Sequence, residues 1–177
     1  MGDKGAATEG DPLTPSISIR PATLADARAV SDVLAASYSL FYRGWYRDDI
    51  LDRALPAMTR ANPALLASGT YYVAETGGRI VSCGGWSREK VGGAATPGLF
   101  HIRHFATHPD FVRRGAAGAV IERCLAEAEA AGAHEMEALS SLPAEAFYAG
   151  HGFRTQAAVH VPMAGAAFAC MLMRRRF

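Results

Sequence analysis

The segment from Phe105 to Gly132 contains the residues most suited to binding a ligand. An expected strand ends at Thr107, a loop carries Arg113 and Arg114, and the small residues 115–118 lead into a helical pattern. The first N–H groups of a helix lack intrahelical acceptors, and the helix dipole adds positive charge there. Small side chains would let a diphosphate approach these groups closely. The segment therefore predicts an anion site, and the alternative is a loop that merely happens to be rich in Gly and Ala.

His101, His104 and His108 raise the alternative of a metal site. On an extended strand, positions 101 and 104 point to opposite faces, so the three side chains cannot chelate one ion without breaking the strand. The sequence therefore predicts no metal. The chain also lacks the Gly-Lys-Ser/Thr of an NTPase loop, and the spacing near residue 115 is not the Gly-x-Gly-x-x-Gly of a dinucleotide fold.

The composition predicts one globular domain. The chain has 177 residues, of which half are hydrophobic and a fifth are charged, so it can bury a sizeable core. The formal net charge of +1 gives no reason to expect a nucleic-acid or anionic-membrane surface. We therefore expect neither nucleic acid nor a membrane as a partner.

Cysteine usage and the N-terminus bear on the compartment. Cys83, Cys124 and Cys170 are odd in number, lack a Cys-x-x-Cys pair and have apolar neighbours, which suits buried free thiols in a reducing compartment. Residues 1–16 contain charges but no apolar run, so they are neither a signal peptide nor a membrane span. We expect a flexible leader over 1–16, one domain over 17–177, and a cytoplasmic protein.

Hydrophobic periodicity and turn residues predict strands and helices around one sheet. Thr23 is expected to cap a helix with Val30, Leu34 and Tyr38 on its apolar face, and Pro56 to kink or break the next helix. The expected elements are a strand over 17–20, helices after 23, over 48–60 and from 62 to 69, a hairpin over 70–75 and 79–87, a strand over 99–107, a helix over 115–131, a strand over 135–140, a short helix from 143, and strands over 153–161 and 168–174.

This order of strands and helices indicates a mixed α/β domain with one sheet.

Four segments carry further predictions. The aromatic stretch from Tyr38 to Tyr46 either lines a pocket or fills the core. The loop over 88–98 should be exposed. Arg174 to Arg176 are expected to form a short solvated tail, and the apolar closing strands leave a homodimer possible.

Two motifs stand at a characteristic separation. Residues 108–117, His-Pro-Asp-Phe-Val-Arg-Arg-Gly-Ala-Ala, are similar to a Gln/Arg-x-x-Gly-x-Gly/Ala loop, and residues 141–153 are similar to an Asn-x-x-Ala-x-x-Phe-Tyr-x-x-x-Gly-Phe segment. From Ile17 onward the chain resembles the GNAT superfamily of acetyl-CoA-dependent N-acetyltransferases. Val112 and Ser141 depart from the usual Gln or Arg and Asn. The resemblance implies a single mixed, mostly antiparallel sheet with helices on both faces and splayed central strands (α+β).

The resemblance also implies an acetyl-CoA site between the strands that end at Thr107 and Ser140. The backbone of Phe105, Ala106 and Thr107 would pair with the pantetheine arm, and the Phe105 N–H would polarise the thioester carbonyl. The other residues implied to bind the co-substrate are Arg113, Arg114, Gly115, Ala116, Ala117 and Gly118 at the diphosphate, together with Ser141 and Phe147.

Tyr148 and His101 are the catalytic candidates that the resemblance implies. Tyr148 follows Phe147 in the second motif and would protonate the departing thiolate, whereas His101 stands where several family members carry a glutamate base. Strand alternation would place His101 on one face with Arg103 and Phe105, and His104 on the other. Water is the alternative base.

The implied activity is transfer of the acetyl group of acetyl-CoA to a primary amine of a small molecule or peptide. No cysteine lies in either motif, so we expect direct attack in a ternary complex. The alternative is a CoA-binding sensor or partner-binding module with weak catalysis or none. The acceptor would be selected by residues 38–62, 88–98 and 162–167, which do not identify it.

Overall fold

The computed structural model describes residues 16–177, so the predicted leader lies outside the described residues except for Ser16. The strands are β1 (Ser18–Pro21), β2 (Tyr71–Thr76), β3 (Arg79–Ser87), β4 (Leu99–Thr107), β5 (Glu135–Ser141), β6 (Arg154–Met163) and β7 (Ala166–Arg176). They form one sheet in the order β1-β2-β3-β4-β5-β7-β6. Only β4 and β5 are parallel neighbours. The predicted mixed, mostly antiparallel sheet is confirmed.

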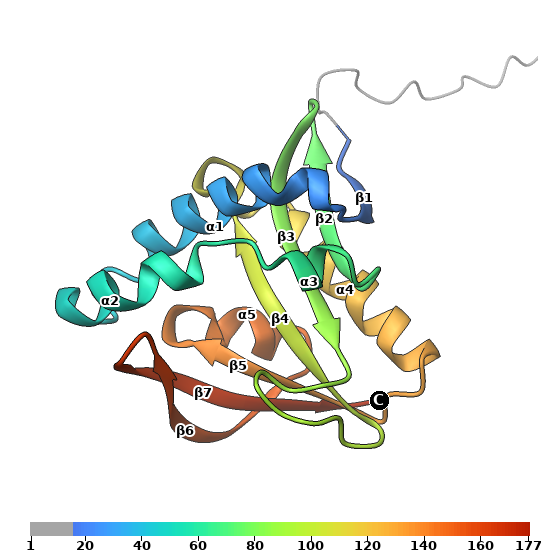
Figure 1. Cartoon of the computed structure of the whole chain (residues 1–177). Coiled ribbons are helices and arrows are strands. Elements are labelled where there is room, and N and C mark those ends of the chain that lie inside the picture. The colour runs from blue at the N-terminus through green and yellow to red at the C-terminus, as the bar shows by residue number, and fades with distance from the viewer. Residues whose placement is uncertain (1–15) are drawn as a thin grey trace, which may run out of the picture.

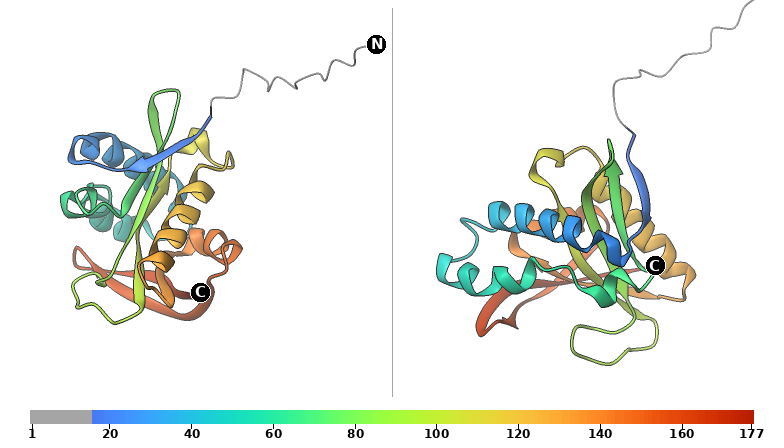
Figure 2. Two further views of the ribbon diagram at one scale, coloured as in Figure 1. Left: turned by 90° about the vertical axis from the view of Figure 1, so that its right-hand side faces the viewer. Right: turned by 45° about the horizontal axis from the view of Figure 1, so that its top comes forward.

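Helices cover both faces of this sheet (Figure 1). The helices are η1 (Leu24–Asp26), α1 (Ala27–Phe41), α2 (Asp48–Met58), α3 (Pro63–Leu66), η2 (Pro109–Phe111), α4 (Ala116–Ala130), η3 (Leu142–Ala144) and α5 (Glu145–Gly150), the η elements being short 3₁₀ helices. Helices α1, α2 and α3 enclose one hydrophobic core against the sheet, and α4 and α5 enclose a second. The left view of Figure 2 shows the two layers on either side of the strands. No helix among residues 16–177 is long and apolar enough to cross a membrane.

The helix faces follow the spacing that the sequence predicts. In α1, Val30, Val33, Leu34 and Tyr38 are buried. Residues three and four apart share one face of a helix, and each fully buried Val or Leu stabilises the fold by roughly 1.5–3 kcal/mol. The second predicted helix passes through Pro56 and ends at Met58, so the predicted break does not occur.

The hairpin of β2 and β3 depends on two glycines. Gly77 and Gly78 have φ of 55° and 74°. A type I′ turn needs positive φ at both central positions, which residues with a Cβ rarely adopt. The Gly-Gly pair thus fixes this hairpin, as predicted.

The C-terminal arginines do not form the solvated tail that the sequence predicts. Arg174 lies within β7 and pairs with Glu135 at 3.1 Å and Glu137 at 2.9 Å across the β5 register. Arg176 reaches Glu135 at 3.4 Å. The cause is the acidic pair on the neighbouring strand, which the local sequence around residue 174 does not reveal.

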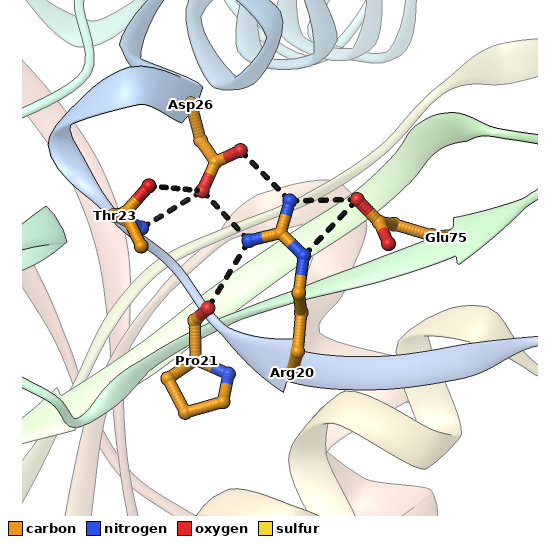
Figure 3. Close-up of polar contacts among 5 residues, drawn as sticks. All are labelled: Arg20, Pro21, Thr23, Asp26 and Glu75. Carbon is orange, nitrogen blue, oxygen red and sulfur yellow. Dashed lines mark hydrogen bonds and ion pairs between the residues drawn. The ribbon is translucent and has the colours of Figure 1, made fainter.

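The start of the fold is fixed by one arginine (Figure 3). The Arg20 guanidinium donates to both carboxylate oxygens of Asp26 at 2.8 Å and to Glu75 at 2.6 Å, joining β1, η1 and β2. Asp26 also accepts the Thr23 backbone N–H at 2.8 Å, which is the predicted helix cap. These hydrogen bonds, that from Arg20 first, lower the pKa of Asp26 to about 2.

Asp26→Asn is expected to lower the free energy of unfolding by about 1–2 kcal/mol at pH 7, because it removes a capping carboxylate and a charged partner. The native pKa is depressed from 3.8 to about 2. The stabilisation is therefore complete above about pH 4 and is lost as the pH falls through about 2. Urea unfolding of parent and variant between pH 7 and 2 measures both effects. Asp32→Asn, exposed on α1, is the matched control; equal stability of the Asp26 variant and the parent at pH 7 would contradict the expectation.

Candidate active site

The two parallel strands at the centre of the sheet separate along their length. β4 and β5 pair at only three positions, which join Leu99–His101 to Glu135–Glu137. Beyond them, β4 stays with β3 as far as Thr107, and β5 stays with β7 as far as Ser141. Figure 1 shows the two strands diverging. The facing backbone edges past this point have no strand partner, so they can pair with an extended ligand. The predicted splay is confirmed.

A β-bulge in β4 determines which side chains face this opening. Cys83 pairs with Ala106 and Gly85 with Arg103, so His104 and Phe105 together oppose Gly84. His104 has a φ of 47°. A Cβ at Gly84 would lie 2.5 Å from the Phe105 ring, so the bulge requires a glycine opposite it.

Because of the bulge, the predicted alternation of side chains along β4 is right for His101 and Arg103 and wrong for Phe105. His101 and Arg103 share a face, as predicted, because they alternate with Phe100 and Ile102 of the α4–α5 core. Phe105 packs against that same α4–α5 core and therefore lies on the opposite face from His101. The extra residue of the bulge reverses the alternation between positions 103 and 105.

Two tyrosine hydroxyls hold the bulge from the α1 side. Tyr38 donates to the Phe105 carbonyl at 2.9 Å, and Tyr71 donates to the His104 carbonyl at 2.8 Å. Burial raises the pKa of both phenols, so they remain protonated donors. Tyr38, Tyr42 and Tyr46 fill the core, whereas Trp45 is 58% exposed, so core filling is confirmed for the tyrosines of this stretch and not for Trp45. Nothing in the sequence marked Tyr38 or Tyr71 as supports of the bulge.

The predicted anion loop leads into the N-terminus of α4. Gly115 caps the helix with a φ of 87°, and Arg113 is also left-handed, with a φ of 62°. A Cβ on Gly115 would meet nothing within 4 Å, so the backbone here lies open. Ala119 takes the first intrahelical bond, to the Gly115 carbonyl at 2.9 Å. The N–H groups of Ala116, Ala117 and Gly118 precede it and have no intrahelical acceptor.

Exposed guanidinium groups surround this loop. Arg113 and Arg114 are exposed. Arg114 lies 5.2 Å and Arg79 5.4 Å from the centre of the Phe111 ring. The sequence reasoning missed Arg79, because it lies at the start of β3 and reaches the loop only through the fold. The loop thus combines N–H groups that lack an intrahelical acceptor with three exposed cations, a setting that suits a phosphate.

Ala106 and Thr107 continue β4 to the mouth of the opening. Ser82 donates to the Ala106 carbonyl at 2.9 Å and lies 2.8 Å from the Thr107 hydroxyl. Across the opening, Ser141 ends β5 and interacts with the Tyr42 hydroxyl. The structure therefore brings the ends of the two predicted strands to opposite sides of one opening.

Aromatic rings from α5 close the opening on the α4 side. The rings of Phe147 and Tyr148 lie 6.2 and 6.3 Å from that of Phe105, between centres. Tyr148 is buried at 6% exposure, and its hydroxyl makes no hydrogen bond within residues 16–177. The Tyr148 hydroxyl is not fully enclosed. Among the described residues, the fully enclosed side-chain polar atoms without a hydrogen-bond partner are the Tyr72 hydroxyl and the Trp86 indole nitrogen. Burial raises the pKa of Tyr148 well above its ordinary value, so the phenol keeps its proton.

His101 lies at the last paired position of β4, on the other face of the sheet. It lines an open cavity of about 720 Å³, together with the loop before β4 and the ends of β5 and β7. Its Nδ1 lies 3.4 Å from Oε1 of Glu137, and Oε2 of the same carboxylate accepts from Arg174 at 2.9 Å. Burial lowers the pKa of His101, and Glu137 opposes that shift. The sequence did not single out Glu137, because its proximity to His101 depends on the parallel register.

Within residues 16–177, no group of three or more His, Cys, Asp or Glu side chains is arranged to hold a metal ion. His101 and His108 take different partners, Glu137 and Asp110 respectively. The three cysteines are free and buried, as predicted.

Known proteins share this architecture. A family model described as "Acetyltransferase (GNAT) domain" matches residues 67–155, which include both motifs. A comparison with curated proteins found no significant match.

Several solved structures superpose on nearly the whole chain. A GCN5-related N-acetyltransferase from Rhodopseudomonas palustris has a TM-score of 0.75 at 21% identity, covering 95% of this chain and 100% of its own. The PaiA N-acetyltransferase of Thermoplasma acidophilum, solved with coenzyme A, has a TM-score of 0.70 at 12% identity, covering 92% and 99%. The ribosomal-protein-S18-alanine N-acetyltransferase of Escherichia coli has a TM-score of 0.62 at 14% identity, covering 91% and 94%.

The matched domain, the splayed strands and the shared fold agree, and the chain therefore belongs to the GNAT family of acetyltransferases, acetyl-CoA-dependent acyltransferases.

Proposed function

We propose that this acetyltransferase acetylates a primary amine of a small molecule or peptide by direct attack in a ternary complex. The observation that carries the proposal is the opening between β4 and β5, which has a phosphate-suited helix N-terminus at one end and the Tyr148 hydroxyl beside it. His101 lines a separate cavity on the other face of the same strand. The opening and this cavity therefore lie on opposite faces of β4, which leaves room for two ligands.

The residues present fit acetyl-CoA. Bound there, it would supply an acyl group activated by a thiolate leaving group. The unpaired backbone edge of Phe105 to Thr107 would hold the pantetheine arm as an added strand, with Ser141 and Phe147 across the opening. Arg113, Arg114 and the N–H groups of residues 115–118 would hold the diphosphate, supported by the helix dipole.

Gly115→Glu is expected to weaken acetyl-CoA binding at least several-fold. The new carboxylate would stand at the helix N-terminus, where it competes with the diphosphate for the same N–H groups and repels its charge. Calorimetric titration with acetyl-CoA measures the change.

Gly132→Glu is the matched control for this loop variant. Gly132 follows the other end of α4 with a φ of 94°, and a Cβ there also meets nothing within 4 Å. The control carries a similar backbone strain and the same charge, so it should keep the parent's affinity. Unchanged affinity in the Gly115 variant would remove the loop from the binding site.

The two proton transfers fall to residues of different character. An alkylamine with a pKa near 10 must lose a proton before it attacks, and the departing thiolate must gain one. His101 is mostly neutral at pH 7, and Glu137 beside Nδ1 leaves Nε2 to accept a proton. Tyr148 keeps its phenolic proton until the thiolate takes it.

The protonation of the three cysteine thiols supports direct attack. Burial raises the pKa of Cys83 to about 12 and that of Cys170 to about 11, and it raises the pKa of Cys124 further. A thiol acts as a nucleophile only as thiolate, which these environments disfavour. The cysteines are therefore poor acyl carriers.

The test is an acetylation screen over polyamines, amino acids, aminoglycosides and peptide N-termini, read by mass spectrometry together with acetyl-CoA binding. Acetylation of at least one amine class supports the proposal. Tight binding of acetyl-CoA without turnover over the whole panel would overturn it and favour a CoA-binding sensor.

A further inference from the structure

Two cations beside His101 form no ion pair with a carboxylate of the described part of the chain. Arg103 shares the His101 face of β4 and is half-buried, and its one side-chain hydrogen bond goes to the Ser87 hydroxyl at 2.8 Å. Lys90 lines the His101 cavity. Neither side chain forms an ion pair with any carboxylate of residues 16–177, and Glu89 acts on Arg103 only beyond ion-pair distance.

The acidic residues that line the cavity already form ion pairs. Glu135 pairs with Arg174 and Arg176, and Glu137 pairs with Arg174 and faces His101. These charges balance one another, whereas Lys90 and Arg103, which Glu89 offsets only in part, leave a net positive charge beside the neutral imidazole.

An unpaired half-buried guanidinium is costly to keep. Arg103 is half-buried and donates to a neutral hydroxyl rather than to a carboxylate, and burial lowers its pKa although Glu89 opposes that shift. Protein arginines in such positions are usually satisfied by a carboxylate or phosphate, because the planar fork donates two parallel hydrogen bonds. A bound anion would supply the missing partner.

We infer that the amine acceptor carries a carboxylate, which Arg103 and Lys90 bind while the amine is directed past His101 toward the β4 bulge; this rests on the proposed function. The acceptor class is therefore an amino acid or a similar zwitterion. A polyamine is disfavoured, because its additional ammonium groups would meet the surplus cations. A carboxylate fits because it neutralises them and leaves the amine free for deprotonation.

Matched acceptors isolate the carboxylate. Each α-amino acid is compared with its carboxamide, and 4-aminobutyrate with 4-aminobutyramide, with rates expressed per concentration of neutral amine so that amine basicity cancels. The parent enzyme should prefer one or more acids over their amides by about 10- to 100-fold in kcat/KM. Thermal shifts of the CoA-bound protein should likewise rise with those acids and not with their amides.

Arg103→Gln should lose most of this preference by raising KM for acids about 10- to 100-fold, while amide rates stay within about twofold. Arg103→Lys should recover part of it. Lys90→Gln, at an exposed position that does not threaten folding, should lose a smaller part. Arg28→Gln, exposed on α1, is the charge-matched control and should retain the parent's preference.

Two results overturn the inference. Equal rates for acids and amides in the parent show that no carboxylate is recognised. Equal loss of both series in Arg103→Gln and Lys90→Gln shows that these cations act on something other than the carboxylate. Failure of the proposed function would give a different result, in which acetyl-CoA binds but no amine of either series is acetylated. In that case the thermal shifts show whether the acids bind without being acetylated.

Discussion

Tyr148→Phe is expected to lower kcat by about 10²- to 10⁴-fold, with little change in the affinity for acetyl-CoA. The change removes one oxygen that makes no hydrogen bond within the described residues. Phenylalanine can keep the ring contacts with Phe105, Phe147 and Phe153, whose centres lie 5.2 to 6.3 Å away. The variant loses the proposed proton donor for the thiolate but keeps the packing of α5. Single-turnover kinetics and calorimetry with acetyl-CoA separate the chemical step from binding.

The matched control is Tyr72→Phe. Tyr72 lies in the α4–α5 core, as Tyr148 does, and its hydroxyl, which is fully enclosed, also makes no hydrogen bond within residues 16–177. Its loss should leave kcat within about twofold, because the hydroxyl has no part in the proposed proton transfers. A Tyr148→Phe enzyme with the parent's kcat would show that water or another group protonates the thiolate.

His101→Ala is expected to lower kcat by about 10²-fold or more and to abolish the acidic limb of the pH profile. Burial depresses the pKa of His101 below 6.5. The imidazole is therefore neutral and active at pH 7, and the parent's rate should fall as the pH drops through a value below 6.5. Profiles of kcat and of kcat/KM for parent and variant, between pH 5 and 9, measure the two effects.

Glu137→Gln distinguishes the imidazole from its neighbour. Glu137 opposes the depression of the His101 pKa, so its neutralisation should move the acidic limb to lower pH rather than remove it. If His101→Ala keeps both the parent's rate and its acidic limb, water or another residue is the base, and only the role of Tyr148 survives.

Local signals made most of the fold predictable. The spacing of Val30, Val33 and Leu34 depends only on the helical period, and the Gly77-Gly78 turn depends only on backbone freedom. The glycine loop before α4 was predicted in the same way, because a glycine before an apolar helical pattern is a signal within a few residues; its role as an anion site stays a prediction.

Features that depend on register escaped the sequence. The bulge at His104 requires Gly84, twenty residues earlier on another strand, and it reversed the expected face of Phe105. The same holds for Glu137, which meets His101 only through the parallel pairing, and for Arg174, which meets two carboxylates across a strand. Their side chains look ordinary until distant segments are aligned, so no local pattern identifies them.

The short pairing of β4 with β5 also bears on how the two halves of the sheet are held together. β1 to β4 are antiparallel neighbours on one side, β5 to β7 form an antiparallel group on the other, and three register positions join the two groups. Both hydrophobic cores span this junction: Phe168 of β7 packs with Tyr71 and Ala106 in one core, and Met136 of β5 packs with Phe100 in the other. Side-chain packing therefore joins the two groups where the backbone ladder stops. A ligand strand that paired with the free edges would complete the ladder without displacing either core.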